Sequence, residues 1–199
     1  MKTITYIFTI SMAFLSLFSC KKGSNRIENK KFKIEKESEY HDITDTNNND
    51  ILYLVKFDEP PETDGKGGLQ SILAIDNIQH NLLQSNAEYI QTSLPEEALN
   101  ERLKSIEEEC EDPEIAWKNF KVVDAVKPIT FKGHRGAVAE FEVDEHVDFL
   151  NKTIKKRIKR YVIFVHNDLW NIVVAPATTQ LYDHEMKELD RMLQTLVIK

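Results

Sequence analysis

The feature that most constrains the fold is a pair of apolar segments near the C-terminus, separated by a short turn. Residues 153–166 and 169–175 are rich in β-branched and aromatic residues, and Asn167-Asp168 between them are typical turn formers. Two strands joined by so short a turn pair antiparallel. The chain is therefore expected to contain an antiparallel β-sheet, which helices must cover.

Further strands are expected before this hairpin. The first pair covers residues 51–57 and 69–76, joined by a loop that contains Gly65, Gly67 and Gly68. A second series covers residues 120–126, 128–132 and 137–143, with a turn at Gly133-His134-Arg135-Gly136 before the last of them. That last segment alternates, so that Ala137, Ala139, Phe141 and Val143 form one inner row.

Helices are expected at three places. Ser85 with Glu88, and Ser93 with Glu96, both fit the capping box, and Pro95 suits the first turn of the second helix. The four residues Leu99, Leu103, Ile106 and Cys110 recur at helical spacing along that second helix, and a last helix begins near Tyr182. The expected fold class is therefore α/β of the α+β kind, with an antiparallel sheet covered by helices.

This order of elements resembles the PsbP/DcrB-like superfamily of bacterial lipoproteins. The matching residues are the turn 133–137, the alternating segment 139–143, the paired strands 160–165 and 170–175, and the closing Leu196-Val197-Ile198. The resemblance covers residues 51–199. It implies an α/β/α sandwich without catalytic residues, usually an accessory or binding subunit of a larger complex, and it transfers no functional residue to this sequence.

The N-terminus looks like a lipoprotein signal. A short apolar run after Lys2 ends in Leu17-Phe18-Ser19-Cys20, in which a small residue precedes a cysteine. The run is too short to cross a ~30 Å hydrocarbon core as a permanent helix. Residues 1–19 are expected to be removed and Cys20 to carry the lipid, such as palmitate, which would anchor the protein to a periplasm-facing membrane of the cell envelope. The alternative is an ordinary signal peptide followed by a chance cysteine.

The segment from residue 20 to residue 50 is expected to be a flexible charged tether. Its composition offers too little apolar surface to offset chain entropy. Its basic half could lie on anionic lipid headgroups, and the alternative is a merely solvated spacer. A single domain over residues 51–199 is then expected to follow. The few apolar residues in the segment are Ile27, Phe32, Ile34, Tyr40 and Ile43.

Charge and motifs exclude several classes of function. The formal net charge of −7 disfavours nucleic-acid binding, which needs clustered Lys and Arg. The nucleophile elbow, the zinc-protease motif, the phosphate-binding glycine loop and the Cys-x-x-Cys motif are all missing from the sequence. Cys110 has no disulfide partner once Cys20 is lipidated, and its acidic neighbours disfavour a thiolate. We therefore expect no enzyme, no cofactor and no metal.

Two charged sets lie on the expected strands. Lys155, Arg157 and Lys159 share one face, as a patch for an acidic partner or for lipid headgroups, or alternatively as lysines that protect a sheet edge. A second set of alternating carboxylates could hold a hard cation, but the apolar inner row beside them favours a solvated outer face. This second set is Glu140, Glu142 and Asp144.

Together these features predict a lipid-anchored envelope protein that binds a partner protein and is not an enzyme. Three alternatives stay open: a small-ligand carrier that uses the space between sheet and helix, an immunity or chaperone protein for a secreted partner, and an enzyme with an unrecognised site.

Overall fold

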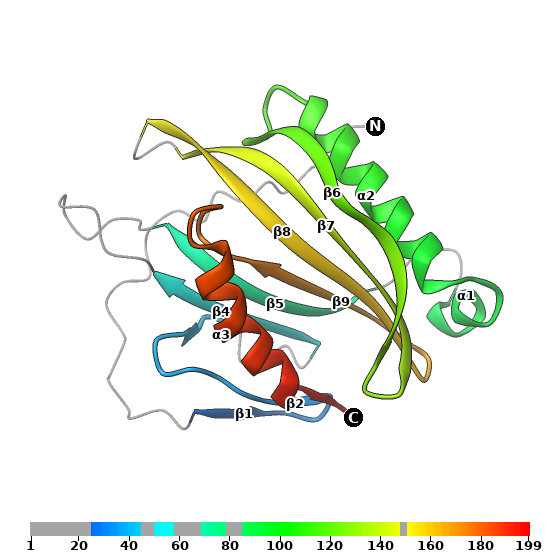
Figure 1. The fold of residues 1–199 in the computed structure, drawn as a ribbon. Coiled ribbons are helices and arrows are strands. Elements are labelled where there is room, and N and C mark those ends of the chain that lie inside the picture. The colour runs from blue at the N-terminus through cyan, green and yellow to red at the C-terminus, as the bar shows by residue number, and fades with distance from the viewer. Residues whose placement is uncertain (1–24, 45–49, 58–68, 79–84, 148–150) are drawn as a thin grey trace, which may run out of the picture.

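A seven-stranded antiparallel sheet forms the centre of the computed structural model, which describes residues 25–44, 50–57, 69–78, 85–147 and 151–199. The strand order is β3-β4-β5-β9-β8-β7-β6 (Figure 1). The β8–β9 hairpin expected from the sequence is present at the middle of this sheet. The strands are β3 (His41–Asp42), β4 (Ile51–Phe57), β5 (Gln70–Ile78), β6 (Trp117–Phe131), β7 (His134–Val147), β8 (Lys152–Val165) and β9 (Asp168–Ala175).

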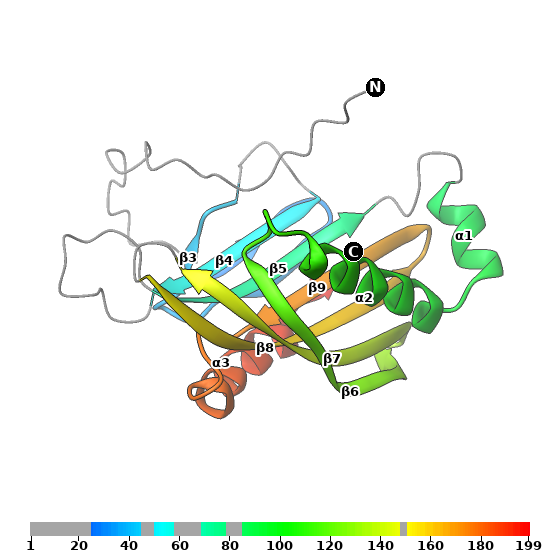
Figure 2. The ribbon, with the colours of Figure 1, turned by 90° about the horizontal axis from the view of Figure 1, so that it is seen from above.

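Helices cover both faces of this sheet. The helices α1 (Asn86–Thr92) and α2 (Pro95–Glu111) pack on one face, and α3 (Tyr182–Thr195) packs on the other (Figure 2). Each face buries its own apolar cluster, because successive side chains of a strand point to opposite sides. The expected α/β/α sandwich with an antiparallel sheet is therefore confirmed.

The α2 face follows the sequence pattern closely. Phe141 and Val143 of β7 are fully buried, as are Ala137 and Ala139, so the predicted inner row is correct. The helix residues that pack on this face are Leu99, Leu103, Ile106 and Cys110, the four that recur at helical spacing. Burying such side chains contributes roughly 25 cal/mol per Å² of apolar surface, which holds α2 on the sheet.

The α3 face contains a buried carboxylate as well as apolar side chains. Leu189 and Leu193 of α3 pack against strand residues that include Trp170. Glu185 of α3 is 1% exposed, and its Oε2 accepts hydrogen bonds from the Ser71 hydroxyl and from the Ala177 backbone N–H. A buried carboxylate needs such donors, so this contact fixes the position of α3.

The capping of the helices was predicted correctly in one case of two. Ser85 and Glu88 form the expected capping box at α1. The box expected between Ser93 and Glu96 is wrong, because the Ser93 backbone N–H donates to the Tyr89 carbonyl at 2.9 Å and so closes α1. Helix α2 instead begins after Leu94, whose backbone N–H donates to the side chain of Glu97 at 2.9 Å, with Pro95 in the first turn as expected.

The expected flexible tether is wrong for residues 25–44. Strands β1 (Arg26–Glu28) and β2 (Phe32–Glu35) pair with each other, and β2 also pairs with β10 (Val197–Ile198) at the C-terminus. Phe32, Ile34 and Tyr40 are at most 1% exposed and belong to the core on the α3 face. The folded domain therefore includes residues before residue 51. The other parts of the expected tether, residues 20–24 and 45–49, lie outside the described residues, as do the leader 1–19 and the loop 58–68.

Strand β6 differs from the sequence prediction in its continuity. Two strands were expected on either side of Lys127, but one 15-residue strand runs from Trp117 to Phe131. Its pairing with β7 has register shifts at three places, which accommodate the interruption. Because β6 lies at one end of the strand order, it is an edge strand of the sheet.

Candidate functional site

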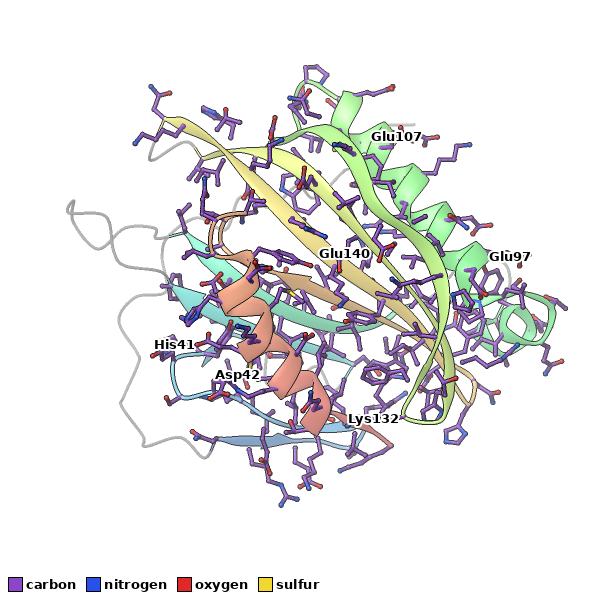
Figure 3. All side chains as sticks on the ribbon, viewed as in Figure 1. His41, Asp42, Glu97, Glu107, Lys132 and Glu140 are labelled. Atoms are coloured by element: carbon purple, nitrogen blue, oxygen red, sulfur yellow. The ribbon has the colours of Figure 1, made fainter. Side chains whose placement is uncertain are left out.

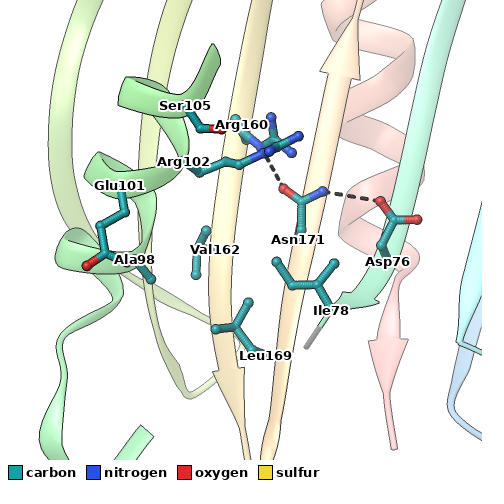
Figure 4. Close-up of a pocket in the computed structure, with 10 residues that line it drawn as sticks. All are labelled: Asp76, Ile78, Ala98, Glu101, Arg102, Ser105, Arg160, Val162, Leu169 and Asn171. Atoms are coloured by element: carbon teal, nitrogen blue, oxygen red, sulfur yellow. Dashed lines mark hydrogen bonds between the residues drawn. The ribbon is translucent and has the colours of Figure 1, made fainter. Parts of the chain in front are cut away.

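An open cleft of about 460 Å³ lies between α2 and the strands β5, β9 and β8 (Figure 4). Its floor consists of alternate residues on three neighbouring strands. Its wall is formed by residues of α2 that lie next to the apolar side chains with which this helix packs on the sheet. The floor residues are Asp76, Ile78, Arg160, Val162, Leu169 and Asn171, and the wall residues are Ala98, Glu101, Arg102 and Ser105.

A row of hydrogen-bonded polar side chains crosses the floor of this cleft. Arg160 of β8 donates from Nε to Oδ1 of Asn171 at 2.7 Å, and Asn171 donates from Nδ2 to Oδ2 of Asp76 at 3.2 Å. Arg160 is 8% exposed and Asn171 is 3% exposed. Figure 4 shows these three side chains lying in sequence over β8, β9 and β5. The amide of Asn171 is therefore placed between the guanidinium and the carboxylate.

Burial shifts the pKa values at both ends of this row. It raises the pKa of Asp76, against the opposing effects of the Asn171 hydrogen bond and the Arg160 charge. Burial, followed by the positive charge of Arg102, lowers the pKa of Arg160 to about 9. A guanidinium with such a pKa still keeps its proton at neutral pH. The cleft therefore holds a buried positive charge that nearby groups only partly balance.

The arrangement offers hydrogen-bond donors at one end of the cleft and apolar contacts at the other. Arg160 and Arg102 are drawn side by side with Ser105 in Figure 4, whereas Ile78 and Leu169 lie toward the opposite end. Arg102 is half exposed, and its Nη1 forms an ion pair with Glu109 at 3.5 Å. These groups are suited to binding a small molecule by charge and by apolar contact.

No residue of this site was predicted from the sequence. Arg160 lies on the face of its strand opposite Lys155, Arg157 and Lys159, and no role was expected for it. A polar residue at an inward position of a strand was the available signal, present at Arg160, at Asn171 and at Asp76. The cleft itself could not be seen in the sequence, because it depends on where α2 lies over three strands that are far apart in the chain.

The expected basic patch lies on the opposite face of the sheet, and its members are paired within the protein. Arg157 is hydrogen-bonded to Glu140 through Nε at 2.9 Å and Nη2 at 2.6 Å. Lys159 is 3.8 Å from the same carboxylate, and Lys155 is 3.3 Å from that of Asp144. Figure 3 marks the position of Glu140. Of the three residues, only Lys159 lies where β8 pairs with both β7 and β9, so the alternative of edge protection stays open for Lys155 and Arg157, which pair with β7 alone.

The carboxylates expected as a metal set or a solvated face belong to this same ladder of charges. Glu140 and Asp144 pair with basic residues of β8, and Glu142 lies directly opposite Arg157 in the strand register. Within the described ranges, no group of three or more His, Cys, Asp or Glu side chains could hold a metal ion.

Of the two cysteines, Cys110 lies in the described residues and Cys20 does not. Cys110 is free and buried on α2, and burial is the main cause that raises the pKa of its thiol, with Glu109 and Glu107 adding to the effect. Cys20, the expected lipid site, lies outside the described residues. None of the helices in the described parts of the chain combines the length and hydropathy that a membrane span requires.

Comparisons with known proteins support the fold. By sequence, the chain matches no family model and no curated protein. By structure, it matches cyanobacterial PsbP (CyanoP) from Synechocystis with a TM-score of 0.56 and 6% sequence identity, over 87% of this chain and 91% of that chain. The chain has a PsbP-like fold. The resemblance stated from the sequence is therefore confirmed for the fold, and at such low identity it says nothing of the activity.

Two further structures are similar to this PsbP-like chain at lower scores. A protein of unknown function from Pseudomonas aeruginosa has a TM-score of 0.47 and 11% identity, over 87% of this chain and 96% of that chain. LpqN of Mycobacterium tuberculosis, described as involved in cell envelope biogenesis, has a TM-score of 0.44 and 11% identity, over 87% of this chain and 89% of that chain.

Proposed function

We propose that this PsbP-like protein is a non-enzymatic accessory protein of the bacterial cell envelope, anchored by lipid on Cys20, and that it acts by binding a small molecule in the cleft under α2. One observation carries the proposal: the cleft is built around Arg160, a charged side chain held in place by a buried hydrogen bond to Asn171. Burying a charge is costly, and such a cost is common at sites that bind a ligand.

The structure supports one of the two modes of binding expected from the sequence, a small ligand or a protein partner, more than the other. A partner protein was expected at Lys155, Arg157 and Lys159, but these side chains already have acidic partners within the domain. The small-ligand carrier was expected to use the space between sheet and helix, and the cleft occupies that space. The cleft therefore supports the carrier over a partner at the basic patch.

A protein partner is the second candidate, and the edge strand β6 favours it. This strand has a single neighbour, β7, in the described sheet, and Val122 and Val123 of β6 are exposed. An edge strand of this length can pair with a strand of another protein. The register shifts along β6 and the lysines on it act against such pairing, so this candidate ranks below the cleft.

The test uses the full-length protein purified from its own membranes in detergent. Small molecules that copurify are released by denaturation and identified by mass spectrometry. The variant Ser105→Trp places a large ring at the wall of the cleft, and Lys104→Trp is the matched control, because Lys104 is on the same helix but does not line the cleft.

We expect a small molecule to copurify with the wild type and with Lys104→Trp, and to be lost from Ser105→Trp. Equal retention by both variants would show that the cleft is not the site. A stoichiometric protein partner, recovered in the same purification with no small molecule, would replace the carrier with the second candidate. Recovery of neither would contradict the proposal that the protein acts by binding.

A further inference from the structure

Arg160 forms no ion pair with the described residues despite its burial, although the charges of Asp76 and Glu109 act on it. Its Nε is hydrogen-bonded to Asn171, and no ion pair joins its guanidinium to a carboxylate anywhere in the described ranges. Charged side chains are almost never so fully buried unless they are paired. The guanidinium offers further N–H donors on its two terminal nitrogens, Nη1 and Nη2, beyond the single hydrogen bond from Nε. The cleft therefore contains donors that a bound acceptor would satisfy.

Asp76 does not supply that acceptor directly. Its Oδ2 accepts from Asn171 Nδ2 at 3.2 Å, and Asn171 stands between Asp76 and Arg160 (Figure 4). Because Asn171 is nearly fully buried and is hydrogen-bonded on both sides, it holds this spacing. The charge of Asp76 partly offsets that of Arg160, but the Asp76 carboxylate does not use the hydrogen-bond donors of the guanidinium.

Arg102, on the α2 wall of the cleft, adds a second positive charge. Figure 4 shows its guanidinium beside that of Arg160, and the charge of Arg102 acts to lower the pKa of Arg160. Two like charges that approach each other in a partly buried cleft are unfavourable unless an anion lies with them. Glu109, two turns along the same face of α2, lies 3.5 Å from Arg102 and offsets part of this positive charge, and its charge also acts to raise the pKa of Arg160.

The other end of the cleft is mostly apolar, with Glu101 of α2 beside it (Figure 4). Ile78, Val162 and Leu169 line the floor there, with Ala98 above them on α2. A ligand that fills both ends needs one anionic group and an apolar body. Asp76 and Glu101 also line the cleft, so a doubly charged anion such as phosphate would meet more repulsion than a single carboxylate.

We propose that the cleft binds a small organic monocarboxylate, with its carboxylate on Arg160 and Arg102 and a short apolar body against Ile78, Val162 and Leu169. This inference rests on the proposed function, which places binding in the cleft, and it adds the chemical class of the ligand. A planar guanidinium suits a carboxylate, because two parallel N–H groups can donate to its two oxygens. A short fatty acid and an apolar N-acylated amino acid both have this chemistry.

The experiment compares probes that share an apolar body and differ in charge. Pentanoate, 1-pentanol and pentylammonium are titrated into the full-length protein in detergent by isothermal calorimetry at pH 7, with empty micelles as the blank. Inorganic phosphate tests charge without an apolar body, and N-acetyl-leucine distinguishes the second source of the carboxylate from the first.

We expect pentanoate or N-acetyl-leucine to bind at least about tenfold more tightly than 1-pentanol, and pentylammonium and phosphate to bind more weakly still. Arg102→Gln should weaken carboxylate binding by about tenfold and leave 1-pentanol unchanged, because it removes one charged donor. Lys104→Gln, at an exposed lysine two residues further along α2 than Arg102, is the matched control and should bind like the wild type. Arg160→Lys is the second variant at the buried position and retains the charge.

Equal binding of pentanoate, 1-pentanol and pentylammonium would overturn the carboxylate inference, and so would an unchanged affinity in Arg102→Gln. The proposed function fails separately. If no probe binds the wild type but Ser105→Trp still loses a copurifying small molecule, the cleft remains the binding site and the carboxylate assignment is wrong.

Discussion

Phe32 packs edge-on against Trp170, with ring centroids 6.3 Å apart and ring planes at 88°. Neither side chain is more than 1% exposed. Aromatic pairs in this geometry contribute about 0.5–1.5 kcal/mol beyond the burial of their surface. The contact joins β2 to β9, which are far apart in the sequence, so the segment 25–44 contributes to the core and is not a spacer.

Phe32→Ala should therefore lower the free energy of unfolding by about 3–5 kcal/mol, the usual cost of removing a large buried aromatic side chain. Urea denaturation measures the change. Ile43→Ala is the matched control, because Ile43 lies in the same segment but is 45% exposed, and its loss should cost within about 0.5 kcal/mol. Similar stability of the two variants would contradict the docking of this segment on the sheet.

Local patterns in the sequence were enough to predict most strands and all three helices. The alternation along β7 and the helical spacing of Leu99, Leu103 and Ile106 each report which side chains face a core. The segment 25–44 was missed because its mean composition is polar, although Phe32 and Ile34 alternate as in a strand. Two aromatic side chains and one isoleucine, which are Phe32, Tyr40 and Ile34, carry the burial that docks this segment on the sheet.

Strand order could not be predicted in the same way. Strand β9 pairs with β5 on one side and with residues 159–165 of β8 on the other, and the basic residues of β8 pair with carboxylates of β7. No local pattern reports such long-range pairing. The same limit hid the cleft, because Asp76, Asn171 and Arg160 are brought together only by the order β5-β9-β8.

The ion pair between Arg157 and Glu140 should contribute to stability. Their side chains are 31% and 12% exposed, and the Arg157 guanidinium also lies over the Tyr182 ring, 4.6 Å from its centroid. Arg157→Glu should therefore lower the free energy of unfolding by about 2 kcal/mol, because it places a third carboxylate beside Glu140 and Glu142 and removes the stacking contact.

The charge exchange Arg157→Glu with Glu140→Arg is the matched test. We expect it to recover part of the lost stability, because it restores an ion pair across β7 and β8. Lys155→Glu should have a smaller effect than Arg157→Glu, since Lys155 is 54% exposed. If thermal denaturation showed the exchange to be no more stable than the single variant, the expected recovery would be contradicted, and repulsion from Glu142 and Lys159, which lie directly opposite the two exchanged positions, would outweigh the restored pair.

Lipid anchoring at Cys20 predicts a clear change in fractionation. Cys20→Ala should leave an uncut precursor or release the protein from membranes, because the thiol that accepts the lipid is removed. Mature bacterial lipoproteins carry two or three acyl chains, which makes anchoring stable. Cys110→Ser, at the other cysteine of the chain, is the control and should remain in the membrane fraction. Membrane association of Cys20→Ala equal to that of the wild type would exclude the proposed anchor.

The titration of Asp76 predicts how stability depends on pH. Burial raises the pKa of Asp76 above its ordinary value of 3.8 in the folded protein, so the folded state holds this proton more tightly than the unfolded state does. Stability falls with pH wherever the folded state binds more protons. The contribution of Asp76 should therefore decrease as the pH rises from 3.8 to its raised pKa, and it should be constant above that pKa.

Asp76→Asn isolates this contribution, because an amide of the same shape does not titrate but can still accept the hydrogen bond from Asn171. Urea denaturation of both proteins between about pH 3 and pH 8 gives the difference in their free energies of unfolding, in which the other carboxylates cancel. We expect the wild type to lose stability relative to Asp76→Asn as the pH rises through this window. If the stability of the wild type relative to Asp76→Asn instead increased with pH, the Asn171 hydrogen bond and the charge of Arg160 would outweigh burial. Asp76 would then be ionised in the folded protein as the counter-charge of Arg160.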